Sequence, residues 1–166
     1  MKNFITLFLV ILLSGCSYSF KGASIPAEMK NITINYFENN SLLVVPTLSQ
    51  DFTEALKTRI RTQSKLNIIQ TEGDAILEGR ITNYTLSPVA IQDNTRPTAG
   101  ATRLTIRVNV KYINNLDPTK NFEQSFERFK DFTTSNQSLQ TAELQNIKAV
   151  IDLITEDIFN RAFSQW

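Results

Sequence analysis

The clearest pattern in the chain is a strict alternation of apolar and polar residues over 102–112, TRLTIRVNVKY. Every second residue from Leu104 to Tyr112 is apolar, whereas the residues between them, from Arg103 to Lys111, are polar or charged. Successive side chains of a β-strand point to opposite faces of the sheet. The pattern therefore predicts a strand with one buried face and one polar face.

Residues 75–88 and 122–132 flank this strand and are expected to pair with it in an antiparallel meander. In the first segment the apolar positions change parity near Thr82 and Asn83, which predicts a β-bulge there. The four phenylalanines of the second segment do not share one parity, which predicts another bulge.

Residues 87–101, SPVAIQDNTRPTAGA, lie between two well-patterned strands and show no clear pattern of their own. We expect an extended loop there rather than a linker between domains. Pro88 marks either the end of regular pairing or a position on an edge strand, because proline cannot donate a backbone hydrogen bond.

Four further segments have recognisable periodicity. Residues 30–39 alternate and predict a first strand, and 65–70 predict a short one. Apolar residues recur at helical intervals over 47–63, where Thr47 starts a possible capping box, and again over 141–163. The order of these elements predicts an α+β fold, with a small, mostly antiparallel mixed sheet of four to five strands and two helices packed on one face. The helical apolar positions are Leu48, Phe52, Ala55, Leu56 and Ile60 in the first helix and Leu144, Ile147, Val150, Ile151, Ile154, Ile158, Phe159 and Phe163 in the second.

The N-terminus has the pattern of an export signal. A basic start is followed by a largely apolar run of ten residues over 4–13, which is too short to span a bilayer but suits a signal-peptide core. The run ends in Leu-Ser-Gly-Cys16, which resembles the bacterial lipobox, where the cysteine thiol receives a diacylglycerol and the new N-terminal amine receives a further acyl chain such as palmitate. We therefore expect a signal peptide over residues 1–15, lipid attachment at Cys16 and one domain over 16–166. The alternative is an ordinary signal peptide with an incidental cysteine.

Composition argues against most enzyme chemistry. The chain has no histidine, one cysteine and a formal net charge of +1. It therefore lacks the commonest metal ligand and the commonest general base near neutral pH, and it has no global charge that would attract nucleic acid. We expect no metal and no cofactor beyond the acyl chains. Glu123, Glu127 and Asp131 alternate with polar and basic residues, as on an exposed sheet surface, although an envelope enzyme that uses these carboxylates remains the alternative.

Taken in order, several segments resemble the LptE family of lipopolysaccharide-assembly lipoproteins, in its shorter Bacteroidetes-type branch. The resemblance starts at CSYSFKG, from Cys16, and covers nearly the whole chain that follows. The matching segments are GASIP, ITINYFEN, PTLSQDFTEALKTRI, LEGRITNYTLSPVAI, RLTIRVNVKYINNLDP, FEQSFERFKDF and LITEDIFNRAFSQW.

The resemblance implies a non-enzymatic role at the outer membrane. Such proteins sit inside the LptD β-barrel as plug and assembly partner, and they can bind lipopolysaccharide. It therefore implies a lipid-anchored protein on the periplasmic side or in the barrel lumen. Arg96, Arg103, Arg107 and Lys111 form the densest basic group, and they are our candidates for contacts with lipopolysaccharide phosphates. A solvated strand face or contacts with the barrel wall are the alternative for these residues. For the whole protein, the alternative is an accessory lipoprotein of another envelope secretion pore.

Overall fold

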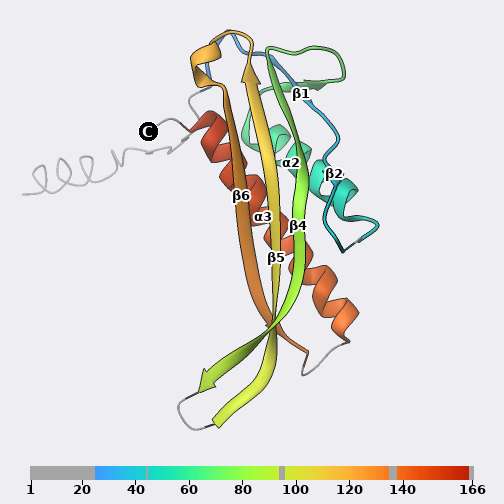
Figure 1. The fold of residues 1–166 in the computed structure, drawn as a ribbon. Helices are drawn as coiled ribbons and strands as arrows, with labels where there is room; N and C mark the ends of the chain where they lie inside the picture. Colours follow the sequence, from blue (N-terminus) through green and yellow to red (C-terminus); the bar gives the residue numbers. More distant parts are fainter. Residues whose placement is uncertain (1–24, 44, 94–95, 135–137, 165–166) are drawn as a thin grey trace, which may run out of the picture.

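The computed structural model describes residues 25–43, 45–93, 96–134 and 138–164. Along the chain, its strands and helices follow the expected order (Figure 1). They are β1 (Asn31–Ile34), β2 (Glu38–Asn39), α2 (Leu48–Gln63), β3 (Asn67–Ile69), β4 (Ala75–Asp93), β5 (Arg96–Asn114), the 3-10 turn η1 (Pro118–Lys120), β6 (Phe122–Thr133) and α3 (Leu139–Phe163).

The strands form one mixed sheet in the order β3-β1-β4-β5-β6, and β2 pairs with β4 beside β1. β1 runs parallel to both β3 and β4, while β4, β5 and β6 form an antiparallel meander. The described residues thus contain six strands. The expected α+β fold with a mostly antiparallel sheet is confirmed, and the two-residue strand β2 brings the number to one above the expected four to five.

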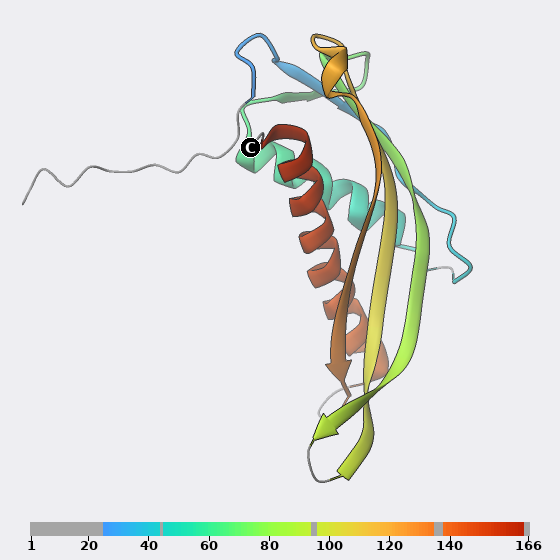
Figure 2. The same cartoon turned by 60° about the vertical axis from the view of Figure 1, so that its left-hand side comes forward.

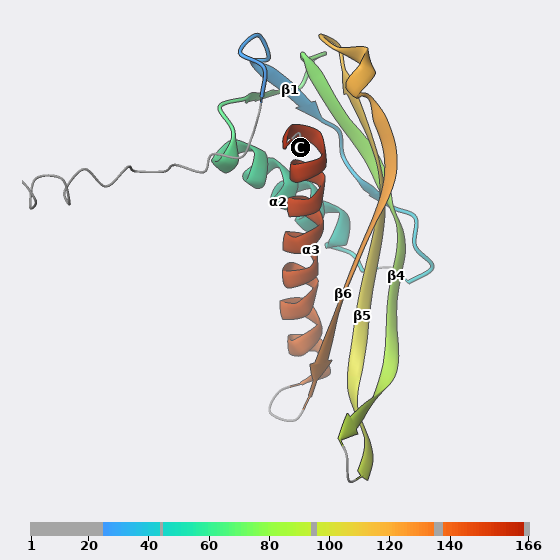
Figure 3. The same cartoon turned by 90° about the vertical axis from the view of Figure 1, so that its left-hand side faces the viewer.

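Both helices cover the same face of the sheet, which curves around them (Figures 2 and 3). Their apolar stripes form one hydrophobic core with the inward side chains of the sheet, and most of this core is fully buried. Leu144 is an exception to the predicted stripe, because its side chain is 47% exposed. The fully buried core residues include Leu48, Phe52, Leu56, Ile60, Leu104, Ile106, Val108, Ile154 and Ile158.

Polar contacts attach the helices to each other and to the sheet. Arg59 of α2 donates from Nε to the Thr155 hydroxyl at 3.1 Å and from Nη2 to the Asp152 carbonyl oxygen of α3 at 3.1 Å. Tyr84 of β4, only 2% exposed, donates its hydroxyl to the Glu143 carboxylate of α3. Burial, followed by this bond, raises the pKa of Tyr84, so the phenol remains a protonated donor.

The β4–β5 hairpin corrects the expectation of an extended loop over 87–101. The two strands remain paired up to Asp93 and Arg96, so most of this segment is strand. The bulge expected near Thr82–Asn83 is confirmed as a register shift between Ile81 and Asn83, and a second shift follows between Val89 and Ala90. Pro88 lies on an edge of the sheet, because β2 pairs only with Arg80 and Ile81 of β4.

In β6 the second predicted bulge is wrong. β5 and β6 pair without interruption from Ala101 and Thr133 to Tyr112 and Phe122. The parity of the phenylalanines breaks because Phe129 points to the opposite face from Phe126, and its side chain is 52% exposed. A single outward aromatic therefore produced the apparent phase shift.

Two local expectations also fail near the start of the chain. Thr47 is the N-cap residue of α2, but its side chain makes no capping hydrogen bond. The alternation predicted over 30–39 does not hold, because Thr33 is buried as well as Ile32 and Ile34. Farther along, Tyr36 is 59% exposed and Phe37 is fully buried. Phe37 packs directly over Gly79 of β4, where an added Cβ would lie 2.7 Å from the Phe37 ring and 2.1 Å from a backbone oxygen of β5.

Candidate functional site

We call the face of β4, β5 and β6 that points away from the helices the outer face. β5 runs along its middle, and the alternation of its sequence places every polar residue of 103–111 on this side. The predicted basic residues of this stretch therefore share one face. These outward residues of β5 are Arg103, Thr105, Arg107, Asn109 and Lys111.

Arg103 makes the most elaborate contact of the outer face. Its Nε and Nη2 donate to the two carboxylate oxygens of Asp131 on β6 at 2.7 and 2.8 Å. Its guanidinium also lies over the Phe129 ring, 4.0 Å from the centroid. The hydrogen bond from Arg103 lowers the pKa of Asp131, and the same bond raises the pKa of Arg103. This planar two-bond pairing fixes the guanidinium against the sheet.

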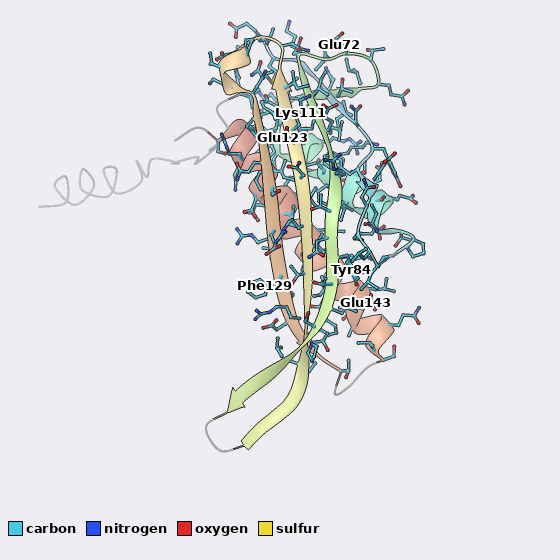
Figure 4. The ribbon with its side chains drawn as sticks, viewed as in Figure 1. Glu72, Tyr84, Lys111, Glu123, Phe129 and Glu143 are labelled. Carbon is cyan, nitrogen blue, oxygen red and sulfur yellow. The ribbon has the colours of Figure 1, made fainter. Side chains whose placement is uncertain are left out.

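The other outward cations of β5 are paired as well. Arg107 forms an ion pair with Glu127 of β6, with 2.6 Å between Nη2 and Oε2. Lys111 lies opposite Glu123 in the strand register, but its Nζ contacts Glu78 of β4 at 3.0 Å. Glu123 instead accepts a hydrogen bond from Asn109 at 3.0 Å. Figure 4 shows Lys111 and Glu123 toward one end of the sheet and Phe129 farther along β6.

The structure thus brings three of the four predicted basic residues together and shows partners that the sequence analysis did not assign to them. Arg103, Arg107 and Lys111 each face a carboxylate on a neighbouring strand, so the outer face carries compensated charge rather than a positive stripe. If β5 and β6 are paired as a hairpin through the turn after Asn114, Arg103 lies opposite Asp131 and Arg107 lies opposite Glu127. The sequence could therefore have predicted both ion pairs.

Two predicted site residues cannot be placed in this way. Cys16 lies outside the described residues. The backbone of Arg96 begins β5 opposite Asp93, but its side chain is outside the described part. Lipid attachment at Cys16 and a role for Arg96 therefore stay predictions.

The described residues contain no group of three or more histidine, cysteine, aspartate or glutamate side chains placed to hold a metal ion. None of the helices in this part of the chain combines the length and apolar character needed to cross a membrane.

Solved structures of several bacterial proteins have a similar fold. A minor lipoprotein from Acinetobacter baumannii superposes with a TM-score of 0.52 at 15% identity, over 80% of this chain and 91% of that chain. A PelC variant from Paraburkholderia phytofirmans, solved as a dodecamer, gives 0.51 at 6% identity, over 86% and 94%. A protein from Xanthomonas campestris gives 0.51 at 11% identity, over 82% and 87%. At these identities the likeness establishes the fold alone.

Sequence comparison is more specific. None of the curated proteins matches the chain. The family model described as LptE, lipopolysaccharide-assembly, matches residues 29–162, which include almost every described strand and helix. The chain therefore belongs to the LptE family of lipopolysaccharide-assembly proteins.

Proposed function

We propose that this protein acts as plug and assembly partner of an LptD-like outer-membrane β-barrel in lipopolysaccharide transport. The observation that carries the proposal is the family match over residues 29–162. The outer face supports it, because the interior of a transmembrane barrel is polar and a plug needs a polar surface that fits it. Paired charges suit this role, since neither the plug nor the wall is left with an unpaired buried charge.

The proposal includes a lipid anchor at Cys16. Two or three acyl chains hold a protein on a membrane far more firmly than one, because each buried methylene contributes about 0.8 kcal/mol. An anchor would keep the domain at the outer membrane while the barrel folds around it. The lipobox-like sequence Leu-Ser-Gly-Cys16 supports this part of the proposal.

We also propose that Arg103, Arg107 and Lys111 contact the phosphates of lipopolysaccharide. All three lie on one face with side chains 39 to 51% exposed. Exposed ion pairs contribute little net stability, so a phosphate can replace a carboxylate as partner at low cost. Arginine can bind a phosphate through two parallel hydrogen bonds, as Arg103 already binds Asp131.

The test is purification of the tagged full-length protein from a detergent-solubilised envelope, followed by identification of the main stoichiometric partner. We expect one large outer-membrane barrel. A Cys16→Ser variant is the matched control for the anchor, and we expect it to leave the membrane fraction. Recovery with a multimeric secretion ring instead would contradict the proposal and favour an accessory role at another envelope pore.

A further inference from the structure

A second feature of the outer face is a shallow depression of about 380 Å³. It lies where the segment around β2 adjoins β4, and it extends across β5 to β6. Lys111 and Glu123, labelled in Figure 4, mark its far side. The volume is within the range of small-molecule sites.

Almost every side chain around this depression is polar. Nine of the ten lining residues carry side-chain nitrogen or oxygen, and the tenth is Gly79. Two cations face three carboxylates, so the lining as a whole has no excess of positive charge. The lining offers donors and acceptors in similar numbers, which fits a ligand rich in hydroxyl groups because a hydroxyl both donates and accepts. The polar residues are Asn35, Tyr36, Glu38, Asn40, Glu78, Arg80, Asn109, Lys111 and Glu123.

Part of the lining is already held in place by hydrogen bonds. Glu78 accepts from Lys111 at 3.0 Å and from Asn35 at 3.4 Å, and Glu123 accepts from Asn109 at 3.0 Å. These bonds involve three strands and orient the carboxylates of Glu78 and Glu123. A ligand that binds here therefore loses little affinity to the ordering of side chains.

Two other lining residues are not engaged in this network. Tyr36 is 59% exposed, and its ring makes no aromatic contact within the described residues. Arg80 lies beside Glu38 and Asn109 in the strand register and makes no hydrogen bond or ion pair with any described residue. The depression thus combines an open aromatic ring, an available guanidinium and a fixed set of acceptors.

We propose that this depression binds a saccharide. The C–H face of a sugar ring packs on Tyr36, while its hydroxyl groups bond to Arg80 and the fixed acceptors. This goes beyond the proposed function, because a saccharide can bind whether or not a barrel surrounds the protein. The same chemistry is available from the sugar portion of lipopolysaccharide and from an unrelated neutral glycan.

The experiment measures glycan binding to the full-length protein in polyoxyethylene detergent, which has no sugar headgroup to compete. The probes are maltohexaose and the core oligosaccharide released from lipopolysaccharide by mild acid, titrated by calorimetry and by saturation-transfer NMR. We expect Tyr36→Ala and Arg80→Gln each to weaken binding at least about tenfold, equal to about 1.4 kcal/mol. Tyr36→Phe keeps the ring and retains binding, and it remains informative if the alanine variant does not fold.

The matched control is Leu42→Ala, which removes a fully exposed apolar side chain from the same segment but outside the depression. We expect this variant to leave the glycan affinity unchanged.

Binding of the core oligosaccharide alone identifies lipopolysaccharide as the source, and binding of both probes or of maltohexaose alone supports a more general saccharide site. The proposal is overturned if neither probe binds, or if Tyr36→Ala binds as the wild type does. It is also overturned if that variant loses the barrel partner but no glycan affinity, since the surface is then a protein interface. Barrel recovery by the wild type is measured separately, so either proposal can fail alone.

Discussion

The two faces of β5 use equal numbers of side chains over the same backbone, yet they have opposite roles. The inward residues from Leu104 to Tyr112 are at most 2% exposed and form the centre of the core. The outward residues bond mainly to neighbouring strands and remain accessible. The comparison separates the two requirements of such a protein, because the inner face can be optimised for stability while the outer face changes to suit its partners.

The largest effect should come from the inner face. Ile106 is fully buried, and Ile106→Ala leaves a cavity among side chains that cannot collapse to fill it. We expect a loss of about 2–5 kcal/mol in the free energy of unfolding, measured by urea denaturation. Thr105→Ala, its neighbour on the outer face, is the control and should change the value by less than about 0.5 kcal/mol. Equal effects would show that the two faces are not distinct in this way.

Gly79 tests how closely the inner face is packed. In Gly79→Ala the new methyl group meets the Phe37 ring and a backbone oxygen of Asn109, so strand or ring must move. We expect a loss of about 1–3 kcal/mol of unfolding free energy. Thr85→Ala on the same strand is the matched control. A Gly79→Ala protein as stable as the wild type would mean that the strands can separate without cost.

A smaller effect is expected where a carboxylate binds the main chain. Asp74 accepts hydrogen bonds from the backbone N–H groups of Lys30 and Asn31, and these bonds lower its pKa. Because the folded pKa lies below the unfolded value of about 3.9, the stabilisation is present above that pH and is lost as the pH falls through the folded pKa. The urea midpoint should therefore fall on acidification below about pH 4.

Two variants isolate this contribution. Asp74→Asn should show a flatter dependence of the urea midpoint on pH, whereas Glu72→Gln, in the same turn (Figure 4), should behave as the wild type. Parallel pH profiles for Asp74→Asn and the wild type would show that the acid loss arises elsewhere.

The smallest change in stability should come from the outer face. Replacing Arg103, Arg107 and Lys111 together by serine removes three exposed ion pairs, each of which contributes little. The fold should remain, as judged by circular dichroism and a cooperative urea transition. The affinity for purified lipopolysaccharide should fall, and its salt dependence should weaken. Unchanged affinity would contradict the proposed phosphate contacts, and unfolding would contradict the division between the two faces.

The sequence predicted those parts of the fold in which burial imposes a pattern. The alternation over 102–112 and, apart from Leu144, the helical stripe of 141–163 are predicted correctly, because each element has one covered face. Residues 87–101 were misread for the opposite reason: they pair as strands beyond the start of the β5–β6 pairing at Ala101, where no third strand demands alternation. Strands that are held together by backbone hydrogen bonds alone need no particular alternation of apolar and polar residues, so the sequence does not reveal them.

Only one property of the candidate site was predictable from the sequence. The alternation over 102–112 predicts that Arg103, Arg107 and Lys111 lie on one face of the sheet. Their neutral pairing depends on which residues stand opposite on β4 and β6, and the false bulge assigned to β6 concealed that register. The depression around Tyr36 was not predictable, since it joins β2 to strands far along the chain.

The length of the β4–β5 hairpin has a consequence for reach. Each strand has 19 residues, so the ribbon has a contour of about 60 Å. The hydrocarbon core of a bilayer is about 30 Å thick. Measured along its curve, the ribbon is therefore about twice as long as that core is thick, and backbone pairing between β4 and β5 connects its far end to the end where the chain enters β4.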